Sequence, residues 1–504
     1  MSSSKKKTVS PDILDWDAIN WHDKEKIVDN LQKRIYRAMS ENNSKKVRNL
    51  QRMLIYSDST LLLAIKRVTQ INKGKKTSGI DGFKIRNDKE RFELYNYLKS
   101  RNIHLHQPKP AHRTYVPKKN GKFRFLGIPT IIDRIYQEII RMALEPQAEV
   151  YFEPTSYGFR PERGCHDAKS RIMYNIKRGN WVYVFEGDFK SCFDTLDHNF
   201  ILEQIKGFPL YKLVKRFLKA GYVDNNVFHN TSQGTPQGGI VSPLLANIAL
   251  HGIEEILGIT YKEKINKGNL THITKGKYRM VRYADDFVIF AKSKENIESI
   301  YVILNSYLEK RGLKLAEDKT RITHISEGFD FLGFHFRQYE NSEGYKCSSS
   351  PSKDSQKRFK SKIKEICKTT YGNNVDVLIK RLNPLITGTA NYWRVSSATK
   401  TFSKMDHYIW GKVFRFIKRL HPRKSMKWIK KTYFPLYDDG KHRDNWVLTG
   451  SKEGNHLKRM AWVPIKNYVM IQFNHSPYDK SKKEYFENRK NFYSKGKICS
   501  SGLS

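Results

Sequence analysis

The segment 279–291, which reads RMVRYADDFVIFA, constrains the fold of this chain more than any other stretch. Two runs of β-branched and aromatic residues flank Asp285 and Asp286, and this pattern predicts a β-hairpin with adjacent carboxylates at its tip. Two like charges on a rigid strand repel each other, and a divalent cation that prefers oxygen ligands, such as Mg²⁺, relieves that repulsion. A solvated Asp-Asp turn is the alternative for this pair on its own.

A second predicted strand, over 181–185, leads into another carboxylate at Asp188. If the two strands pair in one sheet, Asp188, Asp285 and Asp286 converge on a space that fits metal ions. Two ions about 4 Å apart can activate a 3′-hydroxyl and stabilise a leaving pyrophosphate. The three acids therefore predict nucleotidyl transfer. Helical segments separate their strands in a β-α-β-β order, which favours a ferredoxin-like palm.

The charge of the chain indicates a polyanionic partner. Its 504 residues include 93 Lys and Arg against 50 Asp and Glu, a formal net charge of +43, and each phosphate that a cation neutralises releases condensed counterions. An anionic membrane surface is the competing partner, but no apolar run approaches the roughly 18 residues of a spanning helix. The 12% aromatic content suits stacking on bases.

Cysteine usage and the first residues predict an intracellular protein. Five scattered cysteines form no CxxC pair, so we expect reduced thiols, without a zinc site or a disulfide framework. The opening residues 1–7 lack the apolar core of a signal peptide.

Two basic segments precede the predicted palm. Residues 24–70 have the periodicity of amphipathic helices with cations on their outer faces, Lys33 and Arg34 among them. A solvated face is the alternative, and the net charge favours contact with RNA. The Gly- and Lys-rich loop 72–82 follows no strand, so it lacks the context of a phosphate-cradling nucleotide loop. We expect it to lie along a nucleic-acid backbone.

The segment 113–129 is the best hairpin candidate, because Asn-Gly at 120–121 is the strongest short turn signal. Lys118, Lys122 and Arg124 cluster around its tip, where they would hold a triphosphate over an acidic metal site. A hairpin decorated for solubility is the alternative. Further along, Gly and Pro over 233–243 stop regular structure and allow close approach of the backbone to a ligand.

The last third of the chain changes character. Residues 352–435 repeat apolar positions at helical spacing and predict the core of a helical bundle. Residues 436–504 are polar, basic and Tyr-rich with weak periodicity. We expect this remainder to be a small appended binding region.

Taken together, the motifs resemble those of a group II intron-encoded reverse transcriptase/maturase. In chain order they are NKGKKTSGIDG, RTYVPKKNGKFRFLGIP, SYGFRP, GDFKSCFDTLDH, QGTPQGGIVSP, YADD, GLKL followed by KT, and FDFLGF, with LNP and NYW beyond 380. The resemblance implies an α+β right-hand polymerase with a ferredoxin-like palm. Its implied parts are a basic helical N-terminal extension (1–70), fingers and palm (71–345), an α-helical thumb/maturase domain (352–435) and a basic DNA-binding-like region (436–504).

The resemblance also implies which residues bind metal and nucleic acid. Two catalytic Mg²⁺ ions would lie at Asp188, Phe189, Asp285 and Asp286, with Asp188 and Asp285 bridging both ions and Asp286 supporting. The cations expected to contact nucleic acid are Lys33, Arg34, Lys73, Lys75, Lys76, Arg160, Arg394, Lys412 and Arg415.

Four further residues are implied at the incoming nucleotide. Lys118 and Arg124 would grip its triphosphate, and Gln237 would line its pocket. Phe193, five residues after Asp188, occupies the position of a steric gate. An aromatic ring beneath the sugar leaves no room for a 2′-hydroxyl and so selects deoxynucleotides.

The function implied is an RNA-directed DNA polymerase that also binds its own intron RNA and promotes splicing, with dNTPs and target-site DNA as further partners. The sequence leaves open whether the protein forms a dimer. The compartment would be a bacterial cytoplasm or an organelle. One alternative is a splicing-only maturase, which degenerate carboxylates would have supported. Another is a retron or host-defence reverse transcriptase, against which LNP, NYW and the long thumb argue.

Many family members continue into an HNH endonuclease with paired cysteines and histidines. Beyond residue 489 this sequence contains one cysteine, Cys499, and no histidine. We therefore expect no second-strand DNA cleavage by this polypeptide. Mobility would then depend on a nascent replication-fork primer or on another nuclease.

Overall fold

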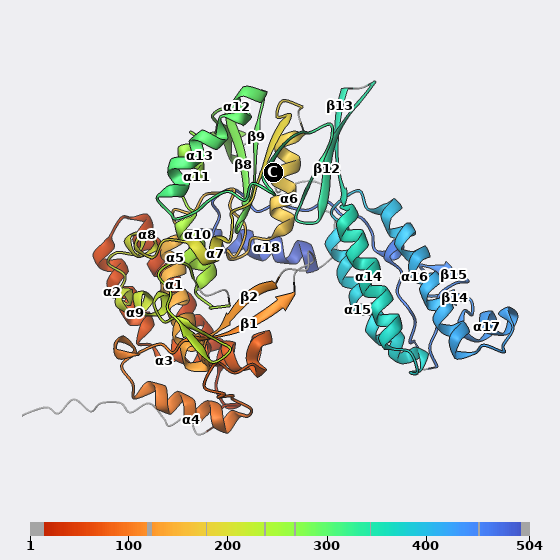
Figure 1. Cartoon of the computed structure of the whole chain (residues 1–504), viewed down its shortest axis with the longest axis horizontal. Coiled ribbons are helices and arrows are strands. Elements are labelled where there is room, and N and C mark those ends of the chain that lie inside the picture. The colour runs from red at the N-terminus through yellow and green to blue at the C-terminus, as the bar shows by residue number, and fades with distance from the viewer. Residues whose placement is uncertain are drawn as a thin grey trace, which may run out of the picture.

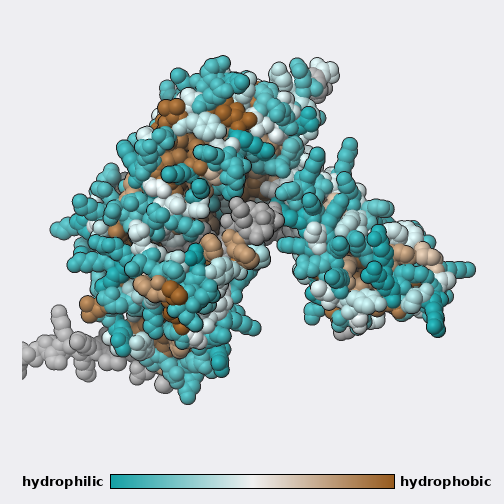
Figure 2. Space-filling model, in the orientation of Figure 1, coloured by the Kyte–Doolittle hydropathy of each residue, from teal (hydrophilic) through white to brown (hydrophobic). Residues whose placement is uncertain are grey.

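The computed structural model describes residues 15–117, 123–177, 179–235, 238–266, 269–342, 344–451 and 454–494. These residues form a larger lobe of helices and sheets and a smaller, mainly helical lobe beside it (Figure 1). Figure 2 shows a mainly hydrophilic surface that is hollowed between the two lobes. Within the described residues, no helix is long and apolar enough to cross a membrane.

Five helices build the fingers of the larger lobe: α1 (Trp21–Ser40), α2 (Ser44–Ile55), α3 (Asp58–Lys66), α4 (Asp88–Lys99) and α5 (Ile131–Ala148). Side chains of Asn20, Asn43 and Asn87 accept hydrogen bonds from backbone N–H groups in the first turns of α1, α2 and α4 and so cap these helices. The buried face of α1 packs on α5 in one hydrophobic core with the palm. The predicted N-terminal extension is therefore continuous with the fingers.

The predicted hairpin forms, with β1 (Ala111–Pro117) antiparallel to β2 (Phe123–Ile128). Its sheet has the order β2-β1-β4-β5, where β4 is Tyr222–Asp224 and β5 is Val227–His229. The guanidinium of Arg113 lies 4.0 Å from the ring centre of Phe125 and 4.2 Å from that of Tyr222. These contacts tie the hairpin to the strand beside it. The tip of the hairpin, residues 118–122, lies outside the described residues.

The palm is a four-stranded antiparallel sheet with the order β10-β3-β9-β8. Its strands are β3 (Tyr183–Gly187), β8 (Tyr278–Tyr283), β9 (Asp286–Ala291) and β10 (Arg321–His324). Helices lie between β3 and β8 and between β9 and β10. This order and connectivity are those of a ferredoxin-like sheet, which confirms the palm predicted from the sequence.

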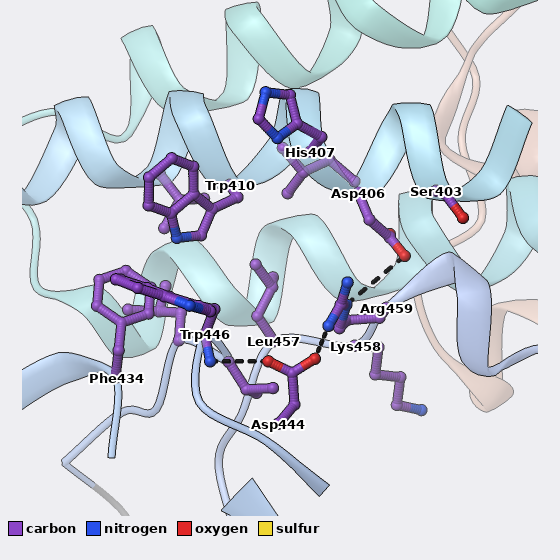
Figure 3. Close-up of a pocket in the computed structure, with 14 residues that line it drawn as sticks. Ser403, Asp406, His407, Trp410, Phe434, Asp444, Trp446, Leu457, Lys458 and Arg459 are labelled. Atoms are coloured by element: carbon purple, nitrogen blue, oxygen red, sulfur yellow. Dashed lines mark hydrogen bonds and ion pairs between the residues drawn. The ribbon is translucent and has the colours of Figure 1, made fainter. Parts of the chain in front are cut away.

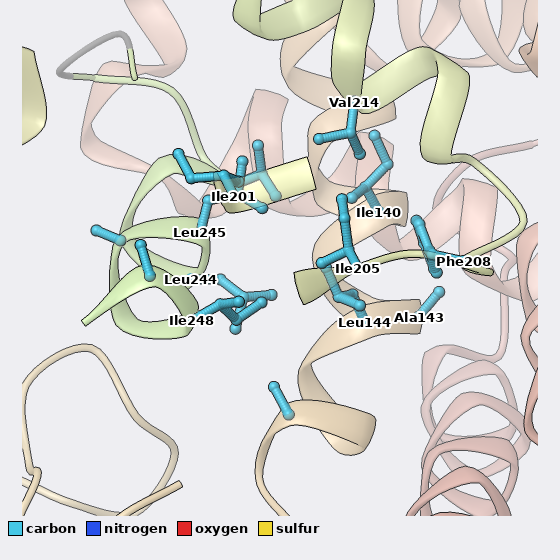
Figure 4. Packing of buried hydrophobic residues seen from close by; sticks show 14 of the residues in the cluster. Ile140, Ala143, Leu144, Ile201, Ile205, Phe208, Val214, Leu244, Leu245 and Ile248 are labelled. Carbon is cyan, nitrogen blue, oxygen red and sulfur yellow. The ribbon is translucent and has the colours of Figure 1, made fainter. Parts of the chain in front are cut away.

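Side chains on the palm strands alternate between two hydrophobic cores, as the two-residue period of a strand requires. Phe185 and Ile289 belong to the core shared with the fingers, whereas Val184 and Val288 belong to a second core shared with the thumb. Figure 4 shows part of the first core, where Ile140 and Leu144 of α5 lie beside Ile205 and Val214. The helices around the sheet are α6 (Cys165–Ile176), α7 (Cys192–Thr195), α8 (His198–Gln204), α9 (Tyr211–Leu218), α10 (Ser242–Ala249), α11 (Ile253–Ile256), α12 (Lys294–Glu298) and α13 (Ile300–Glu309).

Two further β structures flank the palm. A hairpin pairs β6 (Thr260–Asn266) with β7 (Asn269–Lys275). A three-stranded sheet contains β11 (Phe329–Phe331), β12 (Phe334–Asn341) and β13 (Gly344–Pro351), and it leads into the thumb.

The predicted bundle forms the smaller lobe, with helices α14 (Lys353–Thr369), α15 (Val375–Trp393), α16 (Thr399–Leu420) and α17 (Met426–Tyr433). Leu378, Leu382 and Ile386 are fully buried along α15, at the spacing of one helix face. On α16, Phe402 and Met405 are buried in the same core. The apolar periodicity of this region therefore marks its core, as predicted.

The chain after the thumb returns to the larger lobe. It passes through β14 (Tyr437–Asp438) and β15 (Arg443–Asp444), and α18 (Lys483–Ser494) lies close to α6 (Figure 1). The carboxylate of Asp167 on α6 accepts hydrogen bonds from Ile471 N at 2.7 Å and from the Arg489 guanidinium at 2.8 Å. The hydroxyl of Tyr478 donates to Glu145 on α5 at 2.6 Å. Residues 467–489, here called the C-terminal strap, are thus part of the polymerase core rather than an appended region.

Candidate active site

The two acidic strands are neighbours in the palm sheet. Gly187 at the end of β3 pairs with Phe287 on β9, so Asp188 emerges beside Asp286. Tyr283 pairs with Asp286 across the β8–β9 hairpin, which leaves Ala284 and Asp285 in the turn. The structure thus brings the segments that carry the three acids to one end of one sheet, as the sequence predicted, although about a hundred residues separate them.

The SYGFRP motif supports the acidic turn from behind. Ser156 bridges to Arg282 of β8, and the Arg282 guanidinium donates to the carbonyl of Ala284 at 3.2 Å. Ala284 has a left-handed backbone, with φ of 59°. A side chain on Gly158 would overlap the backbone nitrogen of Ala284. The glycine is therefore required by the close approach of this loop to the turn.

Lys319 forms an ion pair within the acidic site. Its ammonium donates to the carboxylate of Asp188 in an ion pair, and this hydrogen bond is the main reason that the pKa of Lys319 is raised. The negative charge of Asp286 acts in the same direction. Across the described ranges, no three His, Cys, Asp or Glu side chains form a ready metal-binding group. Lys319 therefore balances part of the charge that a divalent cation would balance.

The residues around the acids nevertheless fit Mg²⁺. Carboxylate oxygens are the donors that this hard cation prefers, and the 57% exposed side chain of Lys319 has room to leave Asp188. The Phe189 side chain is buried and packs 4.9 Å from the ring of Phe287. Only the backbone of Phe189 can therefore approach an ion. Burial, with the charges of Asp285 and Asp188, raises the pKa of the Cys192 thiol, so this thiol stays neutral next to the acids.

A cavity of about 460 Å³ lies between the fingers sheet and the chain that follows β3. Arg113 and Phe125 line it on one side, and Phe193 with Asp194 lines it on the other. The carbonyl of Phe193 accepts a hydrogen bond from Thr235 N at 2.6 Å, which ties the backbone of Phe193 to the Gly- and Pro-rich loop. The predicted gate residue therefore lines a cavity beside the fingers sheet, and its role stays a prediction.

Three of the four predicted nucleotide contacts fall beyond what the structure describes. Lys118 and Gln237 are outside the described residues, and so is the side chain of Arg124. The backbone of Arg124 pairs with Val116 in the hairpin. Their roles stay predictions.

A second cavity, of about 630 Å³, joins the acidic turn to the thumb. Asp286 lies at one end, and Arg358 and Lys362 of α14 line the thumb side. Neither cation was among the residues predicted from the sequence. Their signal was their four-residue spacing on one face of the first helix after FDFLGF, α14. A nucleic-acid strand that reaches the acids along this groove would meet both.

Most of the cations predicted to contact nucleic acid are at least partly exposed. Lys33 is held by Asp29 one turn earlier at 2.7 Å, and Lys75 donates to the carbonyl of Gln70 at 2.8 Å. Lys412 lies 5.3 Å from the ring centre of Tyr408. The members with open or half-open surface are Lys33, Arg34, Lys73, Lys75, Lys76, Arg394, Lys412 and Arg415.

Arg160 corrects the prediction of a nucleic-acid contact at this position. Its side chain is buried, and both terminal groups of its guanidinium are used inside the protein. It pairs with both carboxylate oxygens of Glu149, at 2.8 and 2.9 Å, and donates to the carbonyls of Glu153 and Ser156. Arg394 keeps some exposed surface, but its Nε donates to the carbonyl of Pro464 at 3.0 Å. Charge alone does not distinguish such structural arginines from surface ones.

Comparisons with known proteins agree with this arrangement. Residues 116–336 match the family described as reverse transcriptase (RNA-dependent DNA polymerase), and residues 16–98 match the N-terminal domain of reverse transcriptase. Residues 356–434 match the group II intron, maturase-specific domain. These matches cover the fingers, the palm and the thumb in chain order.

Protein YkfC of Escherichia coli (strain K12) is 34% identical over 337 residues, which cover 61% of this chain and 87% of YkfC. Group II intron-encoded protein LtrA of Lactococcus lactis subsp. cremoris is 36% identical over 325 residues, which cover 53% of each. The chain thus spans about half the length of LtrA. A telomerase from Candida albicans, solved in complex with a fragment of telomeric RNA, aligns at 13% sequence identity with a TM-score of 0.36. The alignment covers 62% of this chain and 60% of the telomerase chain.

Four observations point to one family. They are the paired acidic strands, the two reverse transcriptase matches, the maturase match and the 87% coverage of YkfC. The chain belongs to the family of group II intron-encoded reverse transcriptases and maturases.

Proposed function

We propose that this protein copies RNA into DNA at the acidic end of the palm sheet. The observation that carries the proposal is the register of β3 against β9, which places Asp188 beside Asp286 and the Asp285 turn. Asp188, Asp285 and Asp286 would hold two Mg²⁺ ions, with the backbone of Phe189 close by. Bound there, the ions would lower the pKa of the primer 3′-hydroxyl and offset charge on the leaving pyrophosphate.

The protein residues around these acids position the reactants. The turn at Ala284 would hold the carboxylates at the end of the central strands, and Lys319 would leave Asp188 as the site fills. Phe193, in the wall of the 460 Å³ cavity, would exclude a 2′-hydroxyl and so select dNTPs. Arg358 and Lys362, on the thumb side of the second cavity, would hold the backbone of the strand that is extended.

We further propose that the protein binds its intron RNA and target-site DNA through the basic surface. The net charge of +43 and the exposed cations of the fingers and thumb support this. In the maturase role the protein performs no bond chemistry. It supplies positive charge to an RNA that must compact against its own repulsion.

Replacement of Asp285 by asparagine tests the polymerase proposal. The Asp285→Asn variant should incorporate no dNTP above background on poly(rA)/oligo(dT), because the amide removes one anionic metal ligand. Asp318→Asn is the matched control, since it removes an equal charge from an exposed residue next to Lys319. Wild-type incorporation by Asp285→Asn would refute the proposed site.

The same two variants test whether the roles are separable. Affinity for a structured group II intron RNA should stay near wild type in both. It should also fall steeply between low and moderate salt, because binding releases counterions. Loss of RNA binding together with polymerisation in Asp285→Asn would contradict separate surfaces, and a flat salt response would contradict the charge argument.

A further inference from the structure

A pocket in the thumb lies apart from the polymerase site. It is a cavity of about 360 Å³ between α16 and residues 444–459, and its walls include Ser403, His407, Trp410, Phe434, Trp446 and Lys458 (Figure 3). We propose that this thumb pocket binds a single unstacked nucleobase of RNA. The proposal rests on the RNA-binding half of the proposed function and assigns one site to it.

Aromatic rings form one side of the pocket. The ring centres of Trp410 and Trp446 are 5.4 Å apart with their planes at 84°, and Phe434 lies 6.1 Å from Trp446. Trp446 keeps 43% of its surface exposed, which is unusual for a tryptophan in a cluster of aromatic residues. A nucleobase stacks on such a ring irrespective of its identity, because every base has a π-face.

Trp410 also offers a specific polar contact. Its indole Nε1 is buried, and no acceptor for it exists among the described residues. A buried donor without an acceptor is unfavourable, and a carbonyl or ring nitrogen of a base could accept from it. Figure 3 shows this nitrogen on the side of the ring that faces Trp446. Both tryptophans line the same cavity.

Arg459 offsets part of the negative charge of the two acids in the wall, and the backbone N–H groups of Met460 and Ala461 donate hydrogen bonds to Asp406. Asp444 forms an ion pair with Arg459, and Asp406 lies 3.7 Å from the same guanidinium. Asp444 also accepts a hydrogen bond from Trp446 N at 2.8 Å, which fixes the tryptophan backbone. The acids thus shape the pocket.

Cations at the edge of the pocket suit the phosphates on either side of an extruded base. Lys458 lines the opening, and the ammonium of Lys430 lies 4.9 Å from the ring centre of Trp446. Aromatic rings next to cations are the combination that recognises unstacked bases in loops and bulges of RNA. An intron RNA that contacts the thumb would offer such bases.

The test compares two RNAs on the full-length chain. One is a hairpin with a single bulged adenosine, and the other is the same hairpin with an abasic bulge. Because stacking of one base is worth about 1–3 kcal/mol, the wild-type protein should bind the hairpin with the bulged adenosine roughly 5- to 150-fold more tightly than the abasic hairpin. Trp446→Ala should remove this preference, and Trp410→Phe, which keeps a ring but loses the N–H, should reduce it several-fold.

Trp428→Ala is the matched control, because its ring packs on His421 at 5.1 Å and does not line the pocket. It should keep the preference. Polymerisation on poly(rA)/oligo(dT) by Trp446→Ala shows whether that variant folds, and Trp410→Phe carries the test if it does not. Equal tight binding of both RNAs, or a preference that survives Trp446→Ala, would overturn the pocket alone. Weak binding of both RNAs that does not respond to salt would overturn RNA binding as a whole.

Discussion

Replacement of Arg489 by methionine should release the C-terminal strap from the polymerase core. The Arg489 side chain is 5% exposed, and its guanidinium donates to Asp167 at 2.8 Å, to the carbonyl of Glu162 at 2.8 Å and to the hydroxyl of Tyr468 at 2.9 Å. Asp167 is itself 1% exposed. Methionine keeps the apolar stem, so the change removes mainly the charge.

The magnitude follows from the burial of the partner that remains. Removal of one member of a buried ion pair costs about 3–5 kcal/mol, because the other charge stays in the interior without compensation. Asp167 would keep its hydrogen bond from Ile471 N, which places the cost towards the lower end. A cost towards the lower end raises the population in which the strap is detached by roughly a hundred- to a thousand-fold.

Amide hydrogen exchange of residues 467–489 measures this population directly. Protection in the strap should fall by about two to three orders of magnitude in Arg489→Met, while the palm strands keep theirs. Lys490→Met is the matched control. Its ammonium pairs with Glu162 at 3.4 Å but is 68% exposed, and such a pair is worth about 0–1 kcal/mol. Equal protection in both variants would refute the view that the buried pair holds the strap.

Two further predictions concern the nucleotide pocket and the strap. Phe193→Val should weaken discrimination against ribonucleotides by roughly 10- to 200-fold, a range typical of a pocket that changes by a small group. Phe125→Val, on the opposite wall of the cavity, should leave this discrimination intact. Unchanged discrimination in Phe193→Val would show that Phe193 is not the steric gate. Burial lowers the pKa of His475 in the strap from 6.5 to about 4. Because the unfolded histidine binds its proton first, protection of the strap should fall as the pH drops from about 6.5 towards 4, and His475→Gln should flatten that dependence; an identical pH profile in the variant would exclude His475.

Several elements of the fold could be predicted from local patterns. The runs of β-branched and aromatic residues around 181–185 and 279–291 predicted the palm strands, and the helical repeats of 378–382 and 402–420 predicted the thumb core. These patterns repeat over short distances along the chain, so the sequence alone carries them. The pairing of the two acidic strands was only a hypothesis from the sequence, because it joins distant segments, and the structure shows it.

Other features were decided by contacts between distant residues. Arg160 has the charge and the residue type expected of an RNA-binding cation, but its ion pair with Glu149 holds it in the interior. Asp167 and Arg489 are 322 residues apart, and no periodicity links them. The same holds for Trp410 and Trp446, whose shared pocket exists only because the chain folds back on α16.

The sequence by itself therefore determined the chemical groups of this protein: an acidic hairpin, a second acidic strand and a large positive charge. Only the tertiary structure decided which cations remain at the surface, where they are available to bind nucleic acid. A cation that finds a buried carboxylate becomes part of the core, whereas one without such a partner stays hydrated at the surface. Which of these happens depends on three-dimensional neighbours rather than on residue type.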